Sequence, residues 1–230
     1  MIRSFAVAAA TVLAAFACQP AGLADARTWT DEFLMDKADL VSKGTNPYFV
    51  LEPGYQLVFN DGDATLTITV LEDTKVIDGV ETRVVEERET EGGRLTEVSR
   101  NYFAISKRNN AVFYFGEDVD AYTSSGEVSH GGSWHAGVNG ARAGVMIPGI
   151  ALLGARYYQE VAPGVAMDRA EIVSVSESLE TPAGKFDKVL KIEETTPLEP
   201  GVKEYKLYAP GIGLIKDGDL VLVKHGRQSA

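Results

Sequence analysis

The chain has 230 residues, 45% of them hydrophobic, and 22 Lys+Arg against 33 Asp+Glu give it a formal net charge of −11. The length suits one domain or at most two, and a surface this acidic repels phosphate backbones and anionic lipid, so nucleic acid is not expected as a partner. A single Cys excludes both an internal disulfide and a cysteine-rich zinc site. The sequence contains no phosphate loop, dinucleotide fingerprint or nucleophile elbow.

Residues 1–26 have the features of a signal peptide. Arg3 supplies the positive start, residues 5–18 are apolar but too short for a stable anchor, and residues 24–26 (Ala-Asp-Ala) suit a signal peptidase. We therefore expect export to the periplasm or the medium, with Arg27 as the mature N-terminus and no transmembrane segment in the mature chain. The alternative is a lipobox ending at Cys18, which would be acylated and would anchor the protein. Because Phe occupies position 16 of that segment, we favour cleavage after residue 26.

Residues 27–230 predict a single, mainly β domain that begins with one short helix. The helix is expected over about 30–43, where Thr30 can cap it, Gly44 can end it, and apolar residues recur at helical spacing. Over about 54–225 the apolar period changes to two, which is typical of strands. Turn sequences separate these runs: Asp61-Gly62, Asp78-Gly79, Gly92-Gly93, Asn109-Asn110, Pro182-Ala183-Gly184 and Asp217-Gly218. With about ten strands and no crossover helices, we expect one antiparallel sheet curved into a barrel or half-barrel.

Residues 135–154 interrupt this pattern because they are apolar, Gly-rich and nearly uncharged. They are too Gly-rich for a stable helix and too irregular for a clean strand. We expect a long connection that covers one open end of the sheet. The alternative is a mobile lid over an apolar cavity.

Five motifs occur in one order along the mature chain: NPYF (46–49), YFGE (114–117), GSWxAG (132–137), TTPLEPG (195–201) and YAPGIG (208–213). Together they resemble an uncharacterised family of secreted bacterial β-rich proteins that has no assigned activity. The YAPGIG ending is also similar to the closing strands of periplasmic half-barrels of the lipoprotein-carrier (LolA/LppX-like) class. The chain departs from the first family at His135, where an acidic residue is common, so any chemistry of this histidine would be peculiar to this branch.

His130 and His135 flank a Gly-Gly-Ser-Trp segment and could share a transition metal if a carboxylate joined them. Because residues five apart on a strand face opposite sides, a shared metal would need a bend at the glycines. We favour two exposed loop histidines instead, and we expect no cofactor, with a metal not excluded. The acidic run 81–91 is interpreted as a solvated strand edge.

Aromatic residues gather in the central strands, and most must belong to the core. A curved sheet leaves a concave face that can hold an apolar guest, and Trp134, Tyr102 and Phe113 are the candidate wall of that pocket. The leading hypothesis is an exported envelope protein that binds a hydrophobic or amphiphilic ligand such as a lipid, without catalysis. A metal-assisted envelope hydrolase and a structural or interaction domain are the alternatives. No catalytic residue is assigned.

Overall fold

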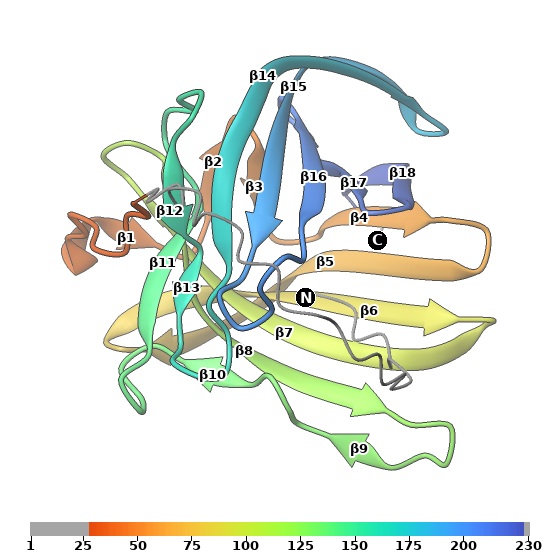
Figure 1. Ribbon diagram of the computed structural model, residues 1–230, viewed down its shortest axis with the longest axis horizontal. Helices are drawn as coiled ribbons and strands as arrows, with labels where there is room; N and C mark the ends of the chain where they lie inside the picture. The colour runs from red at the N-terminus through yellow and green to blue at the C-terminus, as the bar shows by residue number, and fades with distance from the viewer. Residues whose placement is uncertain (1–27, 228–230) are drawn as a thin grey trace, which may run out of the picture.

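The computed structural model describes residues 28–227, and most of these residues belong to one large antiparallel sheet that curves into a nearly closed barrel (Figure 1). A 3-10 turn, η1 (Lys37–Asp39), precedes the strands. The strands, in chain order, are β1 (Leu40–Val41), β2 (Gly44–Asn46), β3 (Phe49–Leu51), β4 (Tyr55–Asn60), β5 (Ala64–Ile77), β6 (Val80–Glu91), β7 (Arg94–Ser106), β8 (Val112–Tyr122), β9 (Val128–Ser129), β10 (Trp134–His135), β11 (Arg142–Ile147), β12 (Arg156–Tyr158), β13 (Glu160–Val161), β14 (Arg169–Thr181), β15 (Gly184–Thr195), β16 (Glu204–Ala209), β17 (Gly213–Asp217) and β18 (Leu220–Arg227).

The two ends of the sheet meet at a single residue. The strands follow the order β12-β14-β15-β16-β17-β18-β4-β5-β6-β7-β8-β11-β13, so β12 and β13 are the terminal strands of the path. In the chain, only Gln159 separates these two strands. Its backbone N–H donates to the Asp168 carbonyl at 2.8 Å, and its side chain is buried. The covalent chain therefore joins both edges of the sheet, which confirms the barrel-like antiparallel architecture expected from the sequence.

The hairpin turns fall where the turn sequences predict them. Asp78 and Gly79 connect β5 to β6 with φ angles of 49° and 77°, the left-handed pair that a tight two-residue hairpin turn requires. The Gly92-Gly93 turn joins β6 to β7 in the same way, with φ angles of 54° and 79°. These turns set the register of the three longest neighbouring strands, which supply one wall of the barrel.

The N-terminal helix expected over 30–43 is wrong. Thr30 forms an isolated parallel bridge with Tyr157, and its carbonyl accepts the Tyr158 N–H at 2.8 Å. Farther on, β1 pairs with β7, and η1 is the only helical turn in this segment of the described chain. Leu34 belongs to the apolar stripe of the expected helix, but its side chain is 99% exposed, so this stripe does not face the core. Backbone hydrogen bonds to the existing sheet outweigh a weak local helix propensity.

The connection expected over 135–154 is also partly wrong, because this stretch contains β11. That strand pairs with β8 on one side and with β13 on the other. Gly144 makes this packing possible, since a Cβ at this position would lie 2.4 Å from the Gln159 carbonyl oxygen. Only residues 148–154 form an irregular segment after the strand, and its Ile150, Leu152 and Leu153 side chains are exposed.

The β2–β3 hairpin packs across one end of the barrel interior. Asn46, at the end of β2, is 2% exposed, and its amide nitrogen donates to the carbonyls of Asn110 and Pro148 at 2.9 and 3.0 Å. Its side-chain oxygen accepts the Tyr48 N–H at 2.8 Å. The next strand then places Phe49 against Phe103, with ring centroids 5.1 Å apart. The NPYF segment thus ties the hairpin to two distant turns.

The predicted signal peptide and Cys18 lie outside the described residues. Between residues 28 and 227, no helix has the length and apolar character needed to cross a membrane.

Gly144→Ala is expected to destabilise the protein by roughly 1–3 kcal/mol or more, because the added methyl group collides with the backbone at Gln159. Gly131→Ala is the matched control, since a Cβ there meets nothing closer than the Ser129 hydroxyl at 3.5 Å. This control should change the free energy of unfolding by less than about 0.5 kcal/mol. Urea unfolding measures both, and equal stability of the two variants would contradict the close contact between β11 and Gln159.

Candidate functional site

The barrel contains adjacent cavities that share lining residues and are open to solvent. One has a volume of about 330 Å³ and a second about 1040 Å³, and both are lined by Glu87, Glu117 and Lys206. A third, narrower space of about 80 Å³ shares Phe103 and Met146 with the first. A ligand site of ordinary size occupies about 300–1,000 Å³, so this interior is the candidate functional site.

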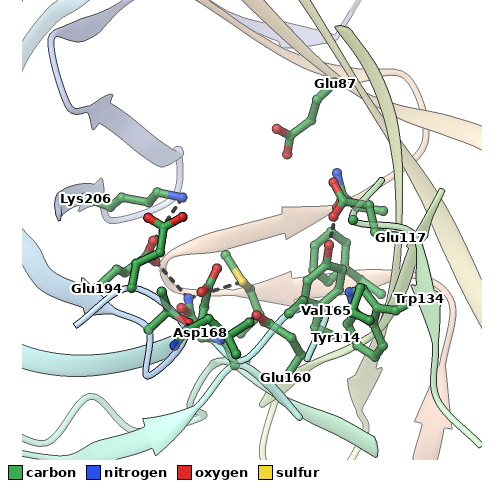
Figure 2. A pocket seen from close by; sticks show the side chains of 18 residues that line it. Glu87, Tyr114, Glu117, Trp134, Glu160, Val165, Asp168, Glu194 and Lys206 are labelled. Atoms are coloured by element: carbon green, nitrogen blue, oxygen red, sulfur yellow. Dashed lines mark hydrogen bonds and ion pairs between the residues drawn. The ribbon is translucent and has the colours of Figure 1, made fainter. Parts of the chain in front are cut away.

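A chain of aromatic rings lines one side of the site. Trp134, on β10, meets Tyr114 edge-on with ring centroids 5.2 Å apart. Tyr114 stacks on Phe103 at 4.8 Å, and Phe103 in turn contacts Phe49. Figure 2 shows Trp134 and Tyr114 together on the wall of the 330 Å³ cavity. Trp134 is therefore part of the lining of this cavity, and its contact with a ligand stays a prediction.

Tyr102 and Phe113 are not among the residues that line these cavities. Strand alternation directs Phe113 away from the side of β8 that carries Tyr114, and Phe113 is buried there. Tyr102 belongs to a polar cluster with Asp118 and His135, described next.

The polar cluster joins Lys75, Tyr102, Asp118 and His135. The Lys75 ammonium donates to Asp118 Oδ2 at 2.8 Å, and His135 Nε2 lies 2.9 Å from Asp118 Oδ1. Burial alone would raise the pKa of Asp118, but the bonds from Lys75 and Tyr102 outweigh it and lower that pKa. Burial and the bond to Asp118 raise the pKa of Tyr102. Tyr102 is therefore protonated at neutral pH and is no general base.

The two histidines have different partners. His130 Nδ1 lies 3.0 Å from Asp120 Oδ1, whereas His135 is paired with Asp118. His130 is exposed, as the favoured interpretation expects, while His135 is partly buried. Within residues 28–227, no group of three or more His, Cys, Asp or Glu side chains is arranged to hold a metal ion. The geometry thus offers no support for a metal shared between His130 and His135.

Acidic side chains line the interior of the barrel. The two larger cavities are lined, within the described chain, by twelve acidic residues and two lysines. The acidic residues are Asp61, Glu87, Glu89, Glu97, Glu117, Glu160, Asp168, Glu194, Glu199, Glu204, Asp217 and Asp219. This concentration of carboxyl groups was not predicted from the sequence.

The run 81–91 shows why the sequence interpretation missed it. These residues form most of β6, which lies between β5 and β7 and is not an edge strand. Alternation turns Glu87 and Glu89 into the barrel, while Glu86 and Arg88 lie outside, where both carry salt bridges. A glutamate at every second position was the available signal, but the sequence does not tell which face of the strand encloses the cavity.

Only part of the inner negative charge is compensated, and this compensation is centred on Lys206. Its ammonium lies 3.0 Å from Glu194 Oε2 and 3.6 Å from Asp217 Oδ2. Burial would lower the pKa of Lys206, but these two carboxylates raise it well above its ordinary value, so the lysine stays charged. Gln159 donates to the other oxygen of Glu194 at 2.9 Å, which connects this ion pair to the joint of the sheet.

Unlike Glu194, Glu87 has no ion pair or hydrogen bond in the described chain that would stabilise its charged form. It makes no hydrogen bond or ion pair with the described residues, and its side chain extends into the central space in Figure 2. Burial raises its pKa to about 7, with Lys206 opposing the shift and Glu117 reinforcing it. Burial also raises the pKa of Glu97 and that of Glu117 to about 7.

The narrow end of the interior is mostly apolar, and Glu87, Lys206 and Asp217 line it where it meets the larger cavities. Leu57, Val70 and Leu214 line it together with Phe49. Tyr208 also lies there, and its buried hydroxyl has no hydrogen-bond partner within residues 28–227. The interior therefore changes from apolar at the end under the β2–β3 hairpin to acidic along β6, β8 and β16.

The raised pKa values predict that stability falls as pH rises from 5 to 8. Between about pH 4.5 and pH 7, the folded protein keeps protons on Glu87, Glu97 and Glu117 that the unfolded chain releases. Unfolding then releases protons, so the free energy of unfolding decreases with rising pH. Glu87→Gln should reduce that decrease by about 1–3 kcal/mol.

Urea unfolding at pH 5 and pH 8 measures this difference, with Glu72→Gln as the matched control on the exposed part of β5. The control should keep the full pH dependence. The assignment of a proton to Glu87 fails if the two variants respond to pH alike.

Comparisons with known proteins gave no match to a family model, to a curated protein or to a solved structure.

Proposed function

We propose that this chain is an exported cell-envelope protein that holds an amphiphilic ligand inside its barrel. The observation that carries the proposal is the change in polarity along adjoining cavities of the barrel. Phe103 and Met146 belong both to the narrow apolar end and to the 330 Å³ cavity, which opens onto acidic side chains. A site with an apolar lining and a few polar groups is typical of small-molecule binding. The similarity of the YAPGIG segment to periplasmic half-barrels also supports this proposal.

The incomplete filling of the interior is the physical argument for a ligand. Protein cores are close-packed, with few voids larger than a water molecule. An interior of several hundred cubic ångströms therefore departs from what stability alone favours. The carboxyl groups that line it add to that cost, since desolvation disfavours their charged forms. A protein is expected to retain such a destabilising cavity where the cavity has a function.

A neutral fluorescent probe, N-phenyl-1-naphthylamine, tests binding directly. Wild-type protein should increase its fluorescence saturably. Ala166→Phe should weaken binding about 10-fold or more, because Ala166 lines the 330 Å³ cavity and the added ring fills that space. Ala183→Phe is the matched control: Ala183 is also partly exposed and irregular, but it lies outside the lining of the cavities. If the wild-type protein binds no probe, the proposal fails and a structural or interaction role takes its place.

Export is tested on the mature protein. Mass spectrometry of material from the native envelope should give an N-terminus at Arg27, because the peptidase recognises the small residues before it. An acylated N-terminal Cys18 would contradict cleavage after residue 26 and would show a lipid-anchored protein instead.

A further inference from the structure

The charge balance of the cavity restricts which polar group a ligand can bring into it. Twelve acidic residues and two lysines line the larger cavities within residues 28–227. Lys206 is already held by Glu194 and Asp217, and Lys203 is bonded to Glu193, outside the lining. A ligand carboxylate or phosphate would therefore enter a region of like charge without a free lysine to meet it.

The carboxyl groups approach the cavity from separate strands. Glu87 comes from β6, Glu117 from β8 and Glu194 from β15, and Figure 2 shows them on different sides of a common space. In the described chain they do not gather into a set of three that could coordinate a metal ion. Dispersed single carboxylates suit an extended organic cation better than a compact metal ion, which needs several oxygen ligands at about 2.0–2.6 Å.

Two features next to Glu87 suit an ammonium group in particular. Trp134 and Tyr114 form the neighbouring wall of the cavity, and aromatic faces attract cations. The buried Tyr208 hydroxyl lines the narrow space together with Glu87 and has no hydrogen-bond partner in the described residues. A phenol oxygen without a partner can accept a hydrogen bond from an ammonium group. These groups are independent of the acidic residues and point to a bound polar molecule.

We propose that the ligand is a cationic amphiphile whose ammonium group lies between Glu87 and Glu117 and whose apolar part extends toward Phe103 and the narrow end of the barrel. This inference rests on the proposed ligand-binding function and specifies its substrate class. An ammonium group forms a charge-assisted hydrogen bond with Glu87 and offsets the repulsion between Glu87 and Glu117. The cationic amphiphile thereby completes a site that is otherwise short of positive charge.

Protonation of the site provides a supporting signature. Glu87 is acted on by Lys206, Glu117 and Asp217, which belong to β16, β8 and β17. Because its pKa is raised to about 7, an ammonium ligand must draw it into the charged form. The affinity for the cation should therefore rise with pH between 6 and 8, whereas that for a neutral ligand should not.

Three dansyl probes with the same fluorophore test the charge preference. They are dansylcadaverine, which carries an ammonium group, its N-acetyl derivative, which is neutral, and 6-(dansylamino)hexanoate, which carries a carboxylate. At pH 8, the ammonium probe should bind wild-type protein about 10-fold or more tightly than the neutral probe, and the carboxylate probe should bind most weakly. Glu87→Gln should remove the preference and retain affinity for the neutral probe. Glu72→Gln is the matched control and should behave as wild type.

The outcomes separate this inference from the function on which it rests. If the neutral or carboxylate probe binds as tightly as the ammonium probe, the cationic class is wrong while ligand binding stands. If none of the three probes binds, the proposed function fails as well. An unchanged preference in Glu87→Gln overturns the assignment to this carboxylate. Circular dichroism confirms folding of each variant, and Glu117→Gln repeats the test from the opposite side of the site.

Discussion

The alternation of side chains along strands that enclose a wide interior is the constraint on which this structure depends. Every strand turns each second residue inward, and a barrel much wider than about eight strands cannot be filled by its own side chains. The sheet here follows a path of thirteen strands before its ends meet at Gln159. The β2–β3 hairpin places Phe49 in the lining of the narrow end, and two larger cavities remain open beside the buried core. Its chemistry is therefore set by whichever residues occupy the inward positions.

These positions combine stabilising and destabilising groups. At the narrow end, Leu57 and Leu214 bury apolar surface, which favours folding. Along β6 and β8, Glu87 and Glu117 are desolvated, and their raised pKa values report the free energy that ionisation costs in the folded state. Lys206 offsets only part of this cost because Glu194 and Asp217 already hold it. The interior therefore has a mostly apolar end and an acidic end, which matches a ligand with one apolar and one polar part.

The sequence was informative about local backbone geometry and less so about which faces are enclosed. Asp78-Gly79 and Gly92-Gly93 identified hairpins because their left-handed φ angles are a local requirement. The helix over 30–43 did not form, since pairing of β1 with β7 is a long-range interaction that no local pattern encodes. Trp134 lines the 330 Å³ cavity, whereas Tyr102 contacts Asp118. Glu87 could not be identified as a cavity residue, because the alternation along a strand shows which residues share a face but not which face points into the barrel.

The joint at Gln159 also affects how the protein behaves among its own copies. A sheet normally exposes two edge strands whose free N–H and C=O groups can pair with another chain. Here the terminal strands of the path, β12 and β13, have three and two residues, and the chain runs directly from one to the other. The longest strand, β5, is paired on both sides, whereas β14 pairs with β12 only over Arg169–Glu171 and has no other strand on that side within the described residues. The joint therefore offers a neighbouring molecule little template for intermolecular β-pairing, and the part of β14 beyond Glu171 is the place in the described chain where such pairing would begin.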